Sequence, residues 1–213
     1  MILSDREIDD ALRRGQVRIT PRPDDLASEV WSSTALDLRL DARLQVWRPP
    51  APGGRFVVDP CDVNFSATEL ASALAHEEDC TEGFEVEPGM FLLGWTIEKV
   101  QLPHASRIAA RVEGKSSLAR IGLGVHVTAP TIHAGFGFRA QDPDFVGNPI
   151  QLEIWNAGPL TVRLVRGLRI CQVIFEEVAG VPGRGYDGVF AIQGPDVPPP
   201  AEPSPEKSGP CGE

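Results

Sequence analysis

Hydrophobic and polar residues alternate at every second position in several short segments of the chain. Leu36, Leu38 and Leu40 alternate with charged residues, the period of a strand with one buried face. From Phe84 onward, β-rich runs separated by Pro and Gly follow one another: FEVEPGMFLLGWTIEKVQLP, RIAARVEG, GVHVTAPTI, PIQLEIWNAG, LTVRLVRG and LRICQVIFEEV. Many short strands with little helix predict a mainly β sandwich or barrel and argue against a βαβ nucleotide-binding fold.

Helical signals are confined to two places in the first half of the chain. Ser4 and Glu7 have the spacing of a capping box, which predicts a short helix from about Asp5 to Arg14 that ends at Gly15. The segment SATELASALAHEED, residues 66–79, favours a helical turn or two within a variable excursion.

The composition is that of one folded domain with a tail. A chain of 213 residues that is 42% hydrophobic is long enough for a single well-packed core, which we expect to span residues 1–195. Residues 196–213, DVPPPAEPSPEKSGPCGE, are rich in Pro, Glu and Ser and are expected to form a disordered tail.

The charge and the apolar runs limit the partners that we expect. A formal net charge of −10 argues against a nucleic-acid partner, because such proteins normally present a basic surface to the phosphates. The N-terminus has no apolar secretory segment, and no apolar run approaches the roughly 20 residues of a membrane span. We therefore expect a cytoplasmic protein that does not bind membranes.

The four cysteines form no pattern typical of a metal site. Cys61, Cys80, Cys171 and Cys211 include no CxxC pair and have no nearby cluster of histidines, which argues against zinc and any other structural metal. We expect all four to be reduced thiols.

The segment GKSSLARIG, residues 114–122, combines groups that bind phosphate. Gly114 permits a close backbone approach, Lys115 and Arg120 are cations, and Ser116 and Ser117 supply hydroxyl donors. The spacing differs from that of a Walker A loop. The segment is therefore either a phosphate-binding turn or an ordinary solvated turn.

Glu153 is a carboxylate inside the apolar run QLEIWN. Strand alternation places it on the face opposite its neighbours Leu152 and Ile154. It is either a solvent-facing residue of an antiparallel sheet or a carboxylate in a partly dry pocket, where it could transfer protons. The alternation pattern does not distinguish these two interpretations.

Several short motifs, taken together and in order, resemble one family. The segments SDREI, LDLRL, EPGMFLLGWT, GKSSLARIGLGVHVTA, LEIWN and QGP are similar to the dCTP deaminase branch of the dUTPase-like superfamily. The resemblance extends from Met1 to about Pro195. It implies a distorted β-barrel or jelly-roll subunit, with a short N-terminal helix, that forms a homotrimer with active sites at the subunit interfaces.

The resemblance also implies a reaction and its catalytic residues. The implied reaction is zinc-free hydrolytic deamination of dCTP to dUTP and ammonia, within dUTP and dTTP biosynthesis, with Mg²⁺ accompanying the triphosphate. Glu153 matches the general base of the family. Ser116 and Arg120 match the residues that position the attacking water and stabilise charge. Feedback inhibition by dTTP is compatible with the resemblance.

Further matched positions are implied to bind the substrate. Lys115 and Ser117 correspond to phosphate-contacting residues, and the backbone at Val127, Thr128 and Ala129 corresponds to groups that read the base edge. Tyr186 and Gln193 resemble residues that close over the triphosphate and exclude water.

The chain departs from the family pattern after this motif. An ungapped alignment of TAPTIHAGF with the family's IDPGF stretch puts His133 where an Asp lies near the deoxyribose, and about ten extra residues, 138–147, follow. A second alignment matches Asp142 to that Asp. The first is preferred because the preceding residues keep register. In related diphosphatases this Asp activates water, so His133 would weaken a diphosphatase assignment.

Three hypotheses about function follow from these observations. The first is deamination of dCTP without diphosphatase activity. The second is a dUTP or dCTP diphosphatase, alone or coupled to deamination, which Asp142 would support. The third is a non-catalytic β-domain that binds nucleotide, which the altered Asp position and the insertion would support.

Overall fold

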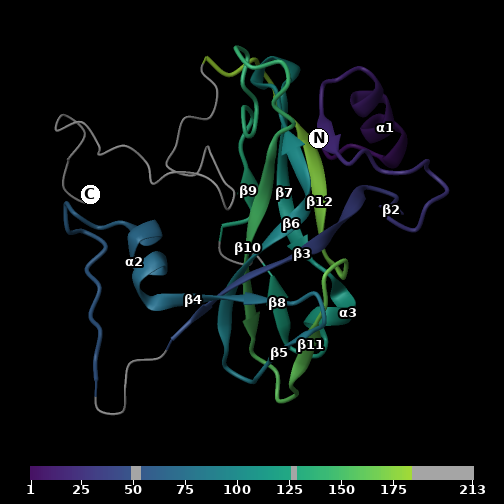
Figure 1. Cartoon of the computed structure of the whole chain (residues 1–213). Coiled ribbons are helices and arrows are strands. Elements are labelled where there is room, and N and C mark those ends of the chain that lie inside the picture. The colour runs from purple at the N-terminus through teal and green to yellow at the C-terminus, as the bar shows by residue number, and fades with distance from the viewer. Residues whose placement is uncertain (49–53, 126–128, 184–213) are drawn as a thin grey trace.

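The computed structural model describes residues 1–48, 54–125 and 129–183, which fold into a curled antiparallel sheet with short helices at its margins (Figure 1). The helices are α1 (Asp5–Arg13), α2 (Ala67–Leu74), α3 (Ser116–Ala119) and the 3-10 turn η1 (His104–Ser106). The strands are β1 (Arg18–Thr20), β2 (Trp31–Ser32), β3 (Ala35–Trp47), β4 (Ala75–Asp79), β5 (Phe84–Val86), β6 (Phe91–Gln101), β7 (Ile108–Gly114), β8 (Leu123–Val125), β9 (Thr131–Ile132), β10 (Asn148–Asn156), β11 (Val162–Leu164) and β12 (Arg169–Glu177).

Helix α1 begins at the predicted capping box. The Glu7 N–H donates to Ser4 Oγ, and the Ser4 N–H donates to Glu7 Oε2 over 2.8 Å. This backbone hydrogen bond from Ser4, followed by the one from its hydroxyl, lowers the pKa of Glu7. The helix ends at Arg13, one residue before the predicted end, and Gly15 follows in the left-handed region at φ 68°.

The strands of the main sheet are arranged in the order β8-β10-β6-β3-β12-β7-β9. Their pairings are antiparallel, and β1 joins β6 while β2 and β4 join β3. The sheet curls so far that β7 approaches β8 near the other end of this order: a Cβ built on Gly114 would lie 3.7 Å from the backbone of Val125. Strands β5 and β11 form a separate pair. The predicted mainly β, barrel-like fold class is confirmed.

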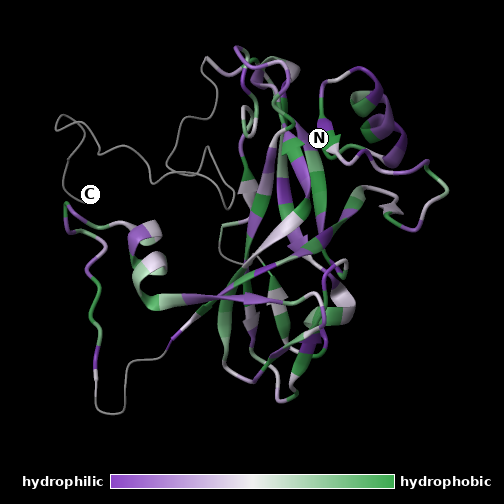
Figure 2. Cartoon of the chain, in the orientation of Figure 1, coloured by the Kyte–Doolittle hydropathy of each residue, from purple (hydrophilic) through white to green (hydrophobic). Residues whose placement is uncertain are grey.

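The core lies inside the curled sheet, and the alternating strands supply it (Figure 2). Leu36, Leu38 and Leu40 of β3 are at most 1% exposed, as their spacing predicts. The opposite face of this strand differs from the expectation of a single buried face, because Asp37 is only 9% exposed. Other segments cover that face of β3 and bury the carboxylate.

The segment 66–79 forms one helix and one strand. Ser66 caps α2 by accepting a hydrogen bond from the Glu69 N–H over 3.2 Å. The helix ends at Leu74, and the acidic residues that follow form β4 along the second half of β3. The predicted helical turn or two is therefore present as α2, and the strand that follows was not predicted, because pairing with β3 overrides the weak local preference of the HEED residues. In Figure 1, α2 and α1 lie on opposite sides of the molecule.

The insertion 138–147 leaves the sheet and returns to it at a single point. A Cβ at Gly137 would lie 2.1 Å from the carbonyl oxygen of Val100, and one at Gly147 would lie 2.7 Å from the same atom. Inside the loop, the Gln101 side chain donates to the carbonyl oxygen of Phe145. The Arg139 guanidinium lies 3.9 Å from the centre of the Phe145 ring. The insertion is therefore a compact loop anchored on β6.

The cysteines differ from one another in oxidation state. Cys61 is disulfide-bonded, so the expectation of four reduced thiols is wrong at this position. Cys61 is exposed, and no spacing pattern in the sequence indicated the bond. Cys80 and Cys171 are buried free thiols. Burial raises the pKa of Cys80 to about 11 and raises the pKa of Cys171 further.

Among the residues that the structure describes, no helix has the length and apolar character that crossing a membrane would require.

Candidate active site

Strand β10, which carries Glu153, is fixed at its beginning by a buried threonine. The ladder between β10 and β6 shifts register between Pro149 and Gln151. At this bulge the Thr96 hydroxyl, which is 1% exposed, accepts a hydrogen bond from the Ile150 N–H over 2.9 Å. It also donates to the Glu98 carbonyl oxygen over 2.7 Å. Because a bulge changes which face the following residues occupy, this contact sets the direction of Glu153.

The end of β10 is fixed by a buried asparagine. Asn156 is 0% exposed, and its amide nitrogen donates to the carbonyl oxygens of Val86 and Leu160, each over 2.8 Å. Its amide oxygen accepts a hydrogen bond from the Gly158 N–H over 3.0 Å. Buried donors and acceptors that are paired in this way favour a single backbone arrangement. Glu153 therefore lies on a strand held at both ends.

Glu153 occupies the outer face of β10 and is partly buried there. Its neighbours Leu152 and Ile154 are 0% exposed and belong to the core, as the alternation predicts. The carboxylate oxygen Oε2 is shielded from solvent. The carboxylate is thus partly dry, which agrees with the second interpretation of the sequence pattern and not with a freely solvated surface residue.

The GKSSLARIG segment forms a tight turn between β7 and β8. The chain leaves β7 at Gly114, and α3 begins immediately after Lys115, whose carbonyl oxygen accepts from the Ala119 N–H over 2.9 Å. Ser116, Ser117 and Arg120 are exposed on this turn. The turn therefore presents two hydroxyls and a guanidinium to solvent, which suits an anionic ligand.

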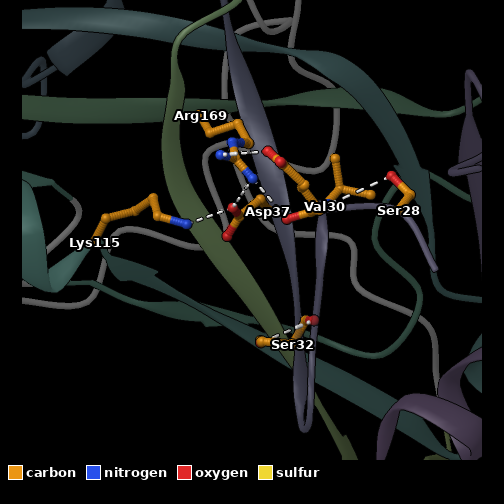
Figure 3. Close-up of polar contacts among 8 residues, drawn as sticks. Ser28, Val30, Ser32, Asp37, Lys115 and Arg169 are labelled. Atoms are coloured by element: carbon orange, nitrogen blue, oxygen red, sulfur yellow. Dashed lines mark hydrogen bonds and ion pairs between the residues drawn. The ribbon is translucent and has the colours of Figure 1, made fainter. Parts of the chain in front are cut away.

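Lys115 lies differently from its three polar neighbours. Its ammonium forms an ion pair with the carboxylate of Asp37, which also lies 3.6 Å from the guanidinium of Arg169 (Figure 3). Arg169 in turn donates to the Glu29 carbonyl oxygen over 2.6 Å. The side chain of Lys115 is 25% exposed and that of Asp37 is 7% exposed, so this cation is held at the edge of the core.

The structure joins the two sequence motifs through β8. Val125 pairs with Ile154 and Leu123 pairs with Asn156, so the chain runs from the turn back alongside β10. Beyond the last pair, a Cβ on Gly122 would lie 2.3 Å from the Cα of Gly158. Asn156, at the end of β10 nearest the turn, lies three strand positions from Glu153, a distance of roughly 10 Å. The turn lies beyond Asn156 and is therefore farther still from the Glu153 carboxylate of the same chain.

The two candidates for the family's Asp position lie in different surroundings. His133 is exposed and directly follows β9, and its carbonyl oxygen accepts from the N–H of Phe136 over 3.1 Å. Phe136 is 2% exposed and anchors this turn in the core. Asp142 is exposed on the insertion.

Several predicted substrate-binding residues lie outside the described residues, namely Val127, Thr128, Tyr186 and Gln193, together with the tail 196–213. Ala129 is described and is exposed just before β9. Within the described ranges, no group of three or more His, Cys, Asp or Glu side chains is arranged to hold a metal ion.

The comparisons with known proteins agree on one family. The model of the family described as dCTP deaminase-like matches residues 2–178. The chain belongs to this family. It is 33% identical over 187 residues to the dCTP deaminase of Rhodospirillum rubrum, an alignment that covers 87% of each chain.

Two further relatives are named for the formation of dUMP. The protein of Methanosphaera stadtmanae named "dCTP deaminase, dUMP-forming" is 36% identical over 188 residues, covering 87% of this chain and 83% of the relative. The Aquifex aeolicus protein of the same name is 34% identical over 198 residues, covering 93% of each. The resemblance inferred from the motifs is therefore confirmed.

A solved structure supports the fold independently of the sequence. The 2'-deoxycytidine 5'-triphosphate deaminase from Agrobacterium tumefaciens superposes with a TM-score of 0.57 at 22% identity. The match covers 82% of this chain and 47% of that one, so this chain spans about half the length of that structure. At this identity the likeness establishes the shared fold.

Three site residues were missed by the sequence reasoning. Asp37 lies within LDLRL, where a charged residue in a strand was assigned to the exposed face. Thr96 and Asn156 lie at strand positions whose hydrogen-bond partners are 54 and 70 residues away. A polar residue inside an apolar strand was the available signal, but the contacts depend on how the sheet curls.

Proposed function

We propose that this protein hydrolyses dCTP to dUTP and ammonia, with Glu153 as the general base. The observation that supports this most directly is the partly buried carboxylate on a strand fixed at both ends, paired with the strand that leaves the GKSSLAR turn. The membership of the dCTP deaminase-like family supports the same substrate.

The reaction uses one water molecule and releases one ammonia molecule. Glu153 accepts a proton from water while the water oxygen forms a bond to C4 of cytosine, which gives a tetrahedral intermediate. The protonated carboxyl gives this proton to N3, which takes up the electron pair of the former C4=N3 bond. Glu153 then accepts the proton of the new C4 hydroxyl and passes it to the 4-amino nitrogen, so that the C4–N bond breaks, ammonia leaves and a C4 carbonyl forms. A carboxylate shielded from bulk water and fixed on a strand suits both steps, because its position favours proton transfer to and from the reacting atoms. The mechanism requires no zinc.

The turn supplies the remaining groups of the proposed site. Ser116 and Arg120 position the water and stabilise the charge that develops around C4, since donors fixed in advance need little reorganisation. Lys115 and Ser117 bind the phosphates. His133 contacts the deoxyribose. In the segments outside the described residues, the backbone of 127–129 reads the base edge, and Tyr186 and Gln193 close over the triphosphate.

We further propose that the active form is a homotrimer with the active sites at its subunit interfaces. Trp155 is 47% exposed and Phe91 is 40% exposed, and both lie on the face that carries Glu153. Large exposed aromatic side chains are typical of surfaces that another protein covers. A second copy placed over this face would complete the burial of Glu153. The second copy would also bring its GKSSLAR turn toward the Glu153 carboxylate of the first. Within one chain, this carboxylate lies roughly 10 Å from the end of β10 that adjoins the turn.

The triphosphate of the substrate also accounts for the metal ion and the inhibitor of the proposed enzyme. Mg²⁺ arrives with the triphosphate, whose oxygens are the ligands that this ion prefers. The pathway is dUTP and dTTP biosynthesis in the cytoplasm, and dTTP, which shares the deoxyribose and the triphosphate, inhibits by occupying the same site.

A second candidate function is deamination followed by release of pyrophosphate to give dUMP. The observation that favours it is the name "dCTP deaminase, dUMP-forming" carried by the Methanosphaera and Aquifex relatives. His133 at the family's Asp position favours the first candidate, because an exposed imidazole replaces the carboxylate that would activate water toward phosphorus.

One experiment separates these candidates. Purified protein is incubated with Mg²⁺ and either dCTP or dUTP, and the nucleotides, ammonia and pyrophosphate are measured by chromatography and coupled assays. In the incubation with dCTP we expect ammonia and dUTP in equal amounts. In the incubation with dUTP we expect no reaction. Formation of dUMP and pyrophosphate would support the second candidate. Nucleotide binding without any product would support the non-catalytic hypothesis and contradict both.

A further inference from the structure

Asp37 and Lys115 form a pair that connects the middle of the sheet to the GKSSLAR turn. Asp37 lies on β3, and its N–H donates to the Val30 carbonyl oxygen over 2.8 Å, which fixes the backbone at this position. Lys115 is the residue immediately before α3. Figure 3 shows the carboxylate of Asp37 between the ammonium of Lys115 and the guanidinium of Arg169.

The buried carboxylate of Asp37 is paired with two cations, Lys115 and Arg169. Asp37 Oδ2 lies at 3.6 Å from Arg169 Nη1 and also accepts the ion pair from Lys115 Nζ. A carboxylate whose side chain is 7% exposed requires such partners, because burying a single charge is costly. Because Arg169 is also paired with the carboxylate of Glu29, the four charges of the cluster balance, and it is the partly exposed ammonium of Lys115 that can attract an incoming polyphosphate.

The pair with Asp37 restrains Lys115 without occupying all its donors. An ammonium group has three N–H donors, and one of them faces Asp37 Oδ2. The remaining donors are available at the mouth of the turn, since the side chain is 25% exposed. A lysine side chain that is already ordered loses less entropy when it binds a ligand than a free one does.

We infer that Asp37 is a positioning residue for the phosphate chain of the substrate: it holds Lys115 Nζ beside the turn so that the ammonium meets the phosphates. Arg169 supports Asp37 from the other side and is itself held by Glu29, whose carboxylate lies 3.3 Å from Arg169 Nη2. This inference rests on the proposed function of the turn in binding dCTP.

The test is a double-mutant cycle on dCTP binding and turnover. We expect Asp37→Asn to raise KM for dCTP about 10-fold, because the charge-assisted contact that orders Lys115 is lost, with kcat changed less than about 2-fold. Lys115→Ala should raise KM by at least as much. In the Lys115→Ala background, Asp37→Asn should have no further effect on KM, because the side chain that it positions is absent.

The matched control is Asp41→Asn. Asp41 lies on the same strand and also forms an ion pair with an arginine, Arg166, over 3.2 Å, but 44% of its side chain is exposed. We expect it to leave KM unchanged.

Asp37→Glu keeps the charge that Arg169 needs and moves it by one methylene, so it should fold and raise KM to an intermediate value. This second variant keeps the inference testable if Asp37→Asn unfolds.

Calorimetric titration with dCTP and with inorganic triphosphate measures affinity without turnover. We expect Asp37→Asn to weaken both ligands by a similar factor, because the phosphate chain is the part that Lys115 meets. An unchanged affinity in Asp37→Asn, or a loss that persists in full in the Lys115→Ala background, would overturn the inference. Binding of dCTP to the wild-type protein without product would instead overturn the proposed reaction and leave the role of Asp37 measurable.

Discussion

Gly122 and Gly158 lie in direct contact, and this contact fastens the turn that follows GKSSLAR to the end of the strand that carries Glu153. A Cβ on Gly158 would lie 2.0 Å from the carbonyl oxygen of Ile121, so no larger residue fits. The Ala157 N–H also donates to the Gly122 carbonyl oxygen over 2.9 Å. The two segments that sequence reasoning singled out separately are therefore parts of one rigid unit.

We expect Gly158→Ala to lower the free energy of unfolding by about 1–3 kcal/mol, because the backbone of Ile121 has to move away from the new methyl group. Gly180→Ala is the matched control, since nothing lies within 4 Å of a Cβ at that position. It should change stability by less than about 0.5 kcal/mol. Urea unfolding of both variants measures the difference in their free energies of unfolding. Equal effects would show that the close contact of Gly158 with Ile121 does not contribute to stability.

The exposed pair Trp155 and Phe91 predicts self-association. Trp155→Glu should convert the assembly into a single chain of 23.0 kDa and reduce activity, because a charge cannot be buried in an apolar interface at low cost. Light scattering coupled to size-exclusion chromatography gives the mass. Leu26→Glu alters a side chain of similar exposure, 39%, in the loop before β2 and should leave the mass unchanged. A wild-type protein that elutes as a monomer would contradict the proposed trimer.

The proposed general base makes a direct prediction. Glu153→Gln should reduce kcat about 10²-fold or more, because the amide cannot accept the proton from water, while the thermal unfolding temperature stays close to that of the wild type. Glu85→Gln, an exposed carboxylate on β5, should retain full activity. Ammonia release is the readout. Rapid turnover by Glu153→Gln would remove this residue from the mechanism.

The alternative alignments assign the deoxyribose contact to different residues. His133→Ala should raise KM for dCTP several-fold, because His133 follows β9 beside a turn anchored by the buried Phe136. Asp142→Ala, which alters the exposed insertion, should have a smaller effect. Steady-state kinetics of both variants, with dUMP measured in parallel, decide between the alignments. A larger loss in Asp142→Ala would favour the second one.

The buried thiols predict low reactivity in the native protein. Because burial raises the pKa of Cys80 to about 11, only about 0.1% of this group is thiolate at pH 8. Since the pKa is raised, the neutral thiol favours the folded state below its ordinary pKa of 9.0, and this contribution is lost as the pH rises toward 11. Iodoacetamide at pH 8 should therefore leave Cys80 and Cys171 unmodified.

Mass spectrometry after labelling checks this result, and the same protein in concentrated urea is the control in which both thiols should react. Cys61 should react only after reduction, because it is disulfide-bonded. Fast labelling of Cys80 in the folded protein would show that its segment opens on the timescale of the experiment.

Local patterns determined much of the fold. Period-two alternation identified the strand that contains Leu36, Leu38 and Leu40, because a strand with one buried face places apolar residues at every second position. From Phe84 onward, β-rich runs separated by Pro and Gly identified the strands. The capping box at Ser4 and Glu7 predicted α1 to within one residue, since both of its hydrogen bonds form between residues three positions apart. The shorter strands β1, β2 and β4 were missed, because they exist only where β6 or β3 offers an edge.

The sequence by itself determined which residue types could bind phosphate and transfer protons, because Lys115, Ser116, Arg120 and Glu153 carry those groups wherever they lie. Tertiary structure alone decided their environment. The curl of the sheet and the bulge held by Thr96 partly bury Glu153, and Asp37 holds Lys115 from a strand 78 residues earlier. Burial and charge pairing depend on distances between segments far apart in sequence, and no local pattern encodes those distances.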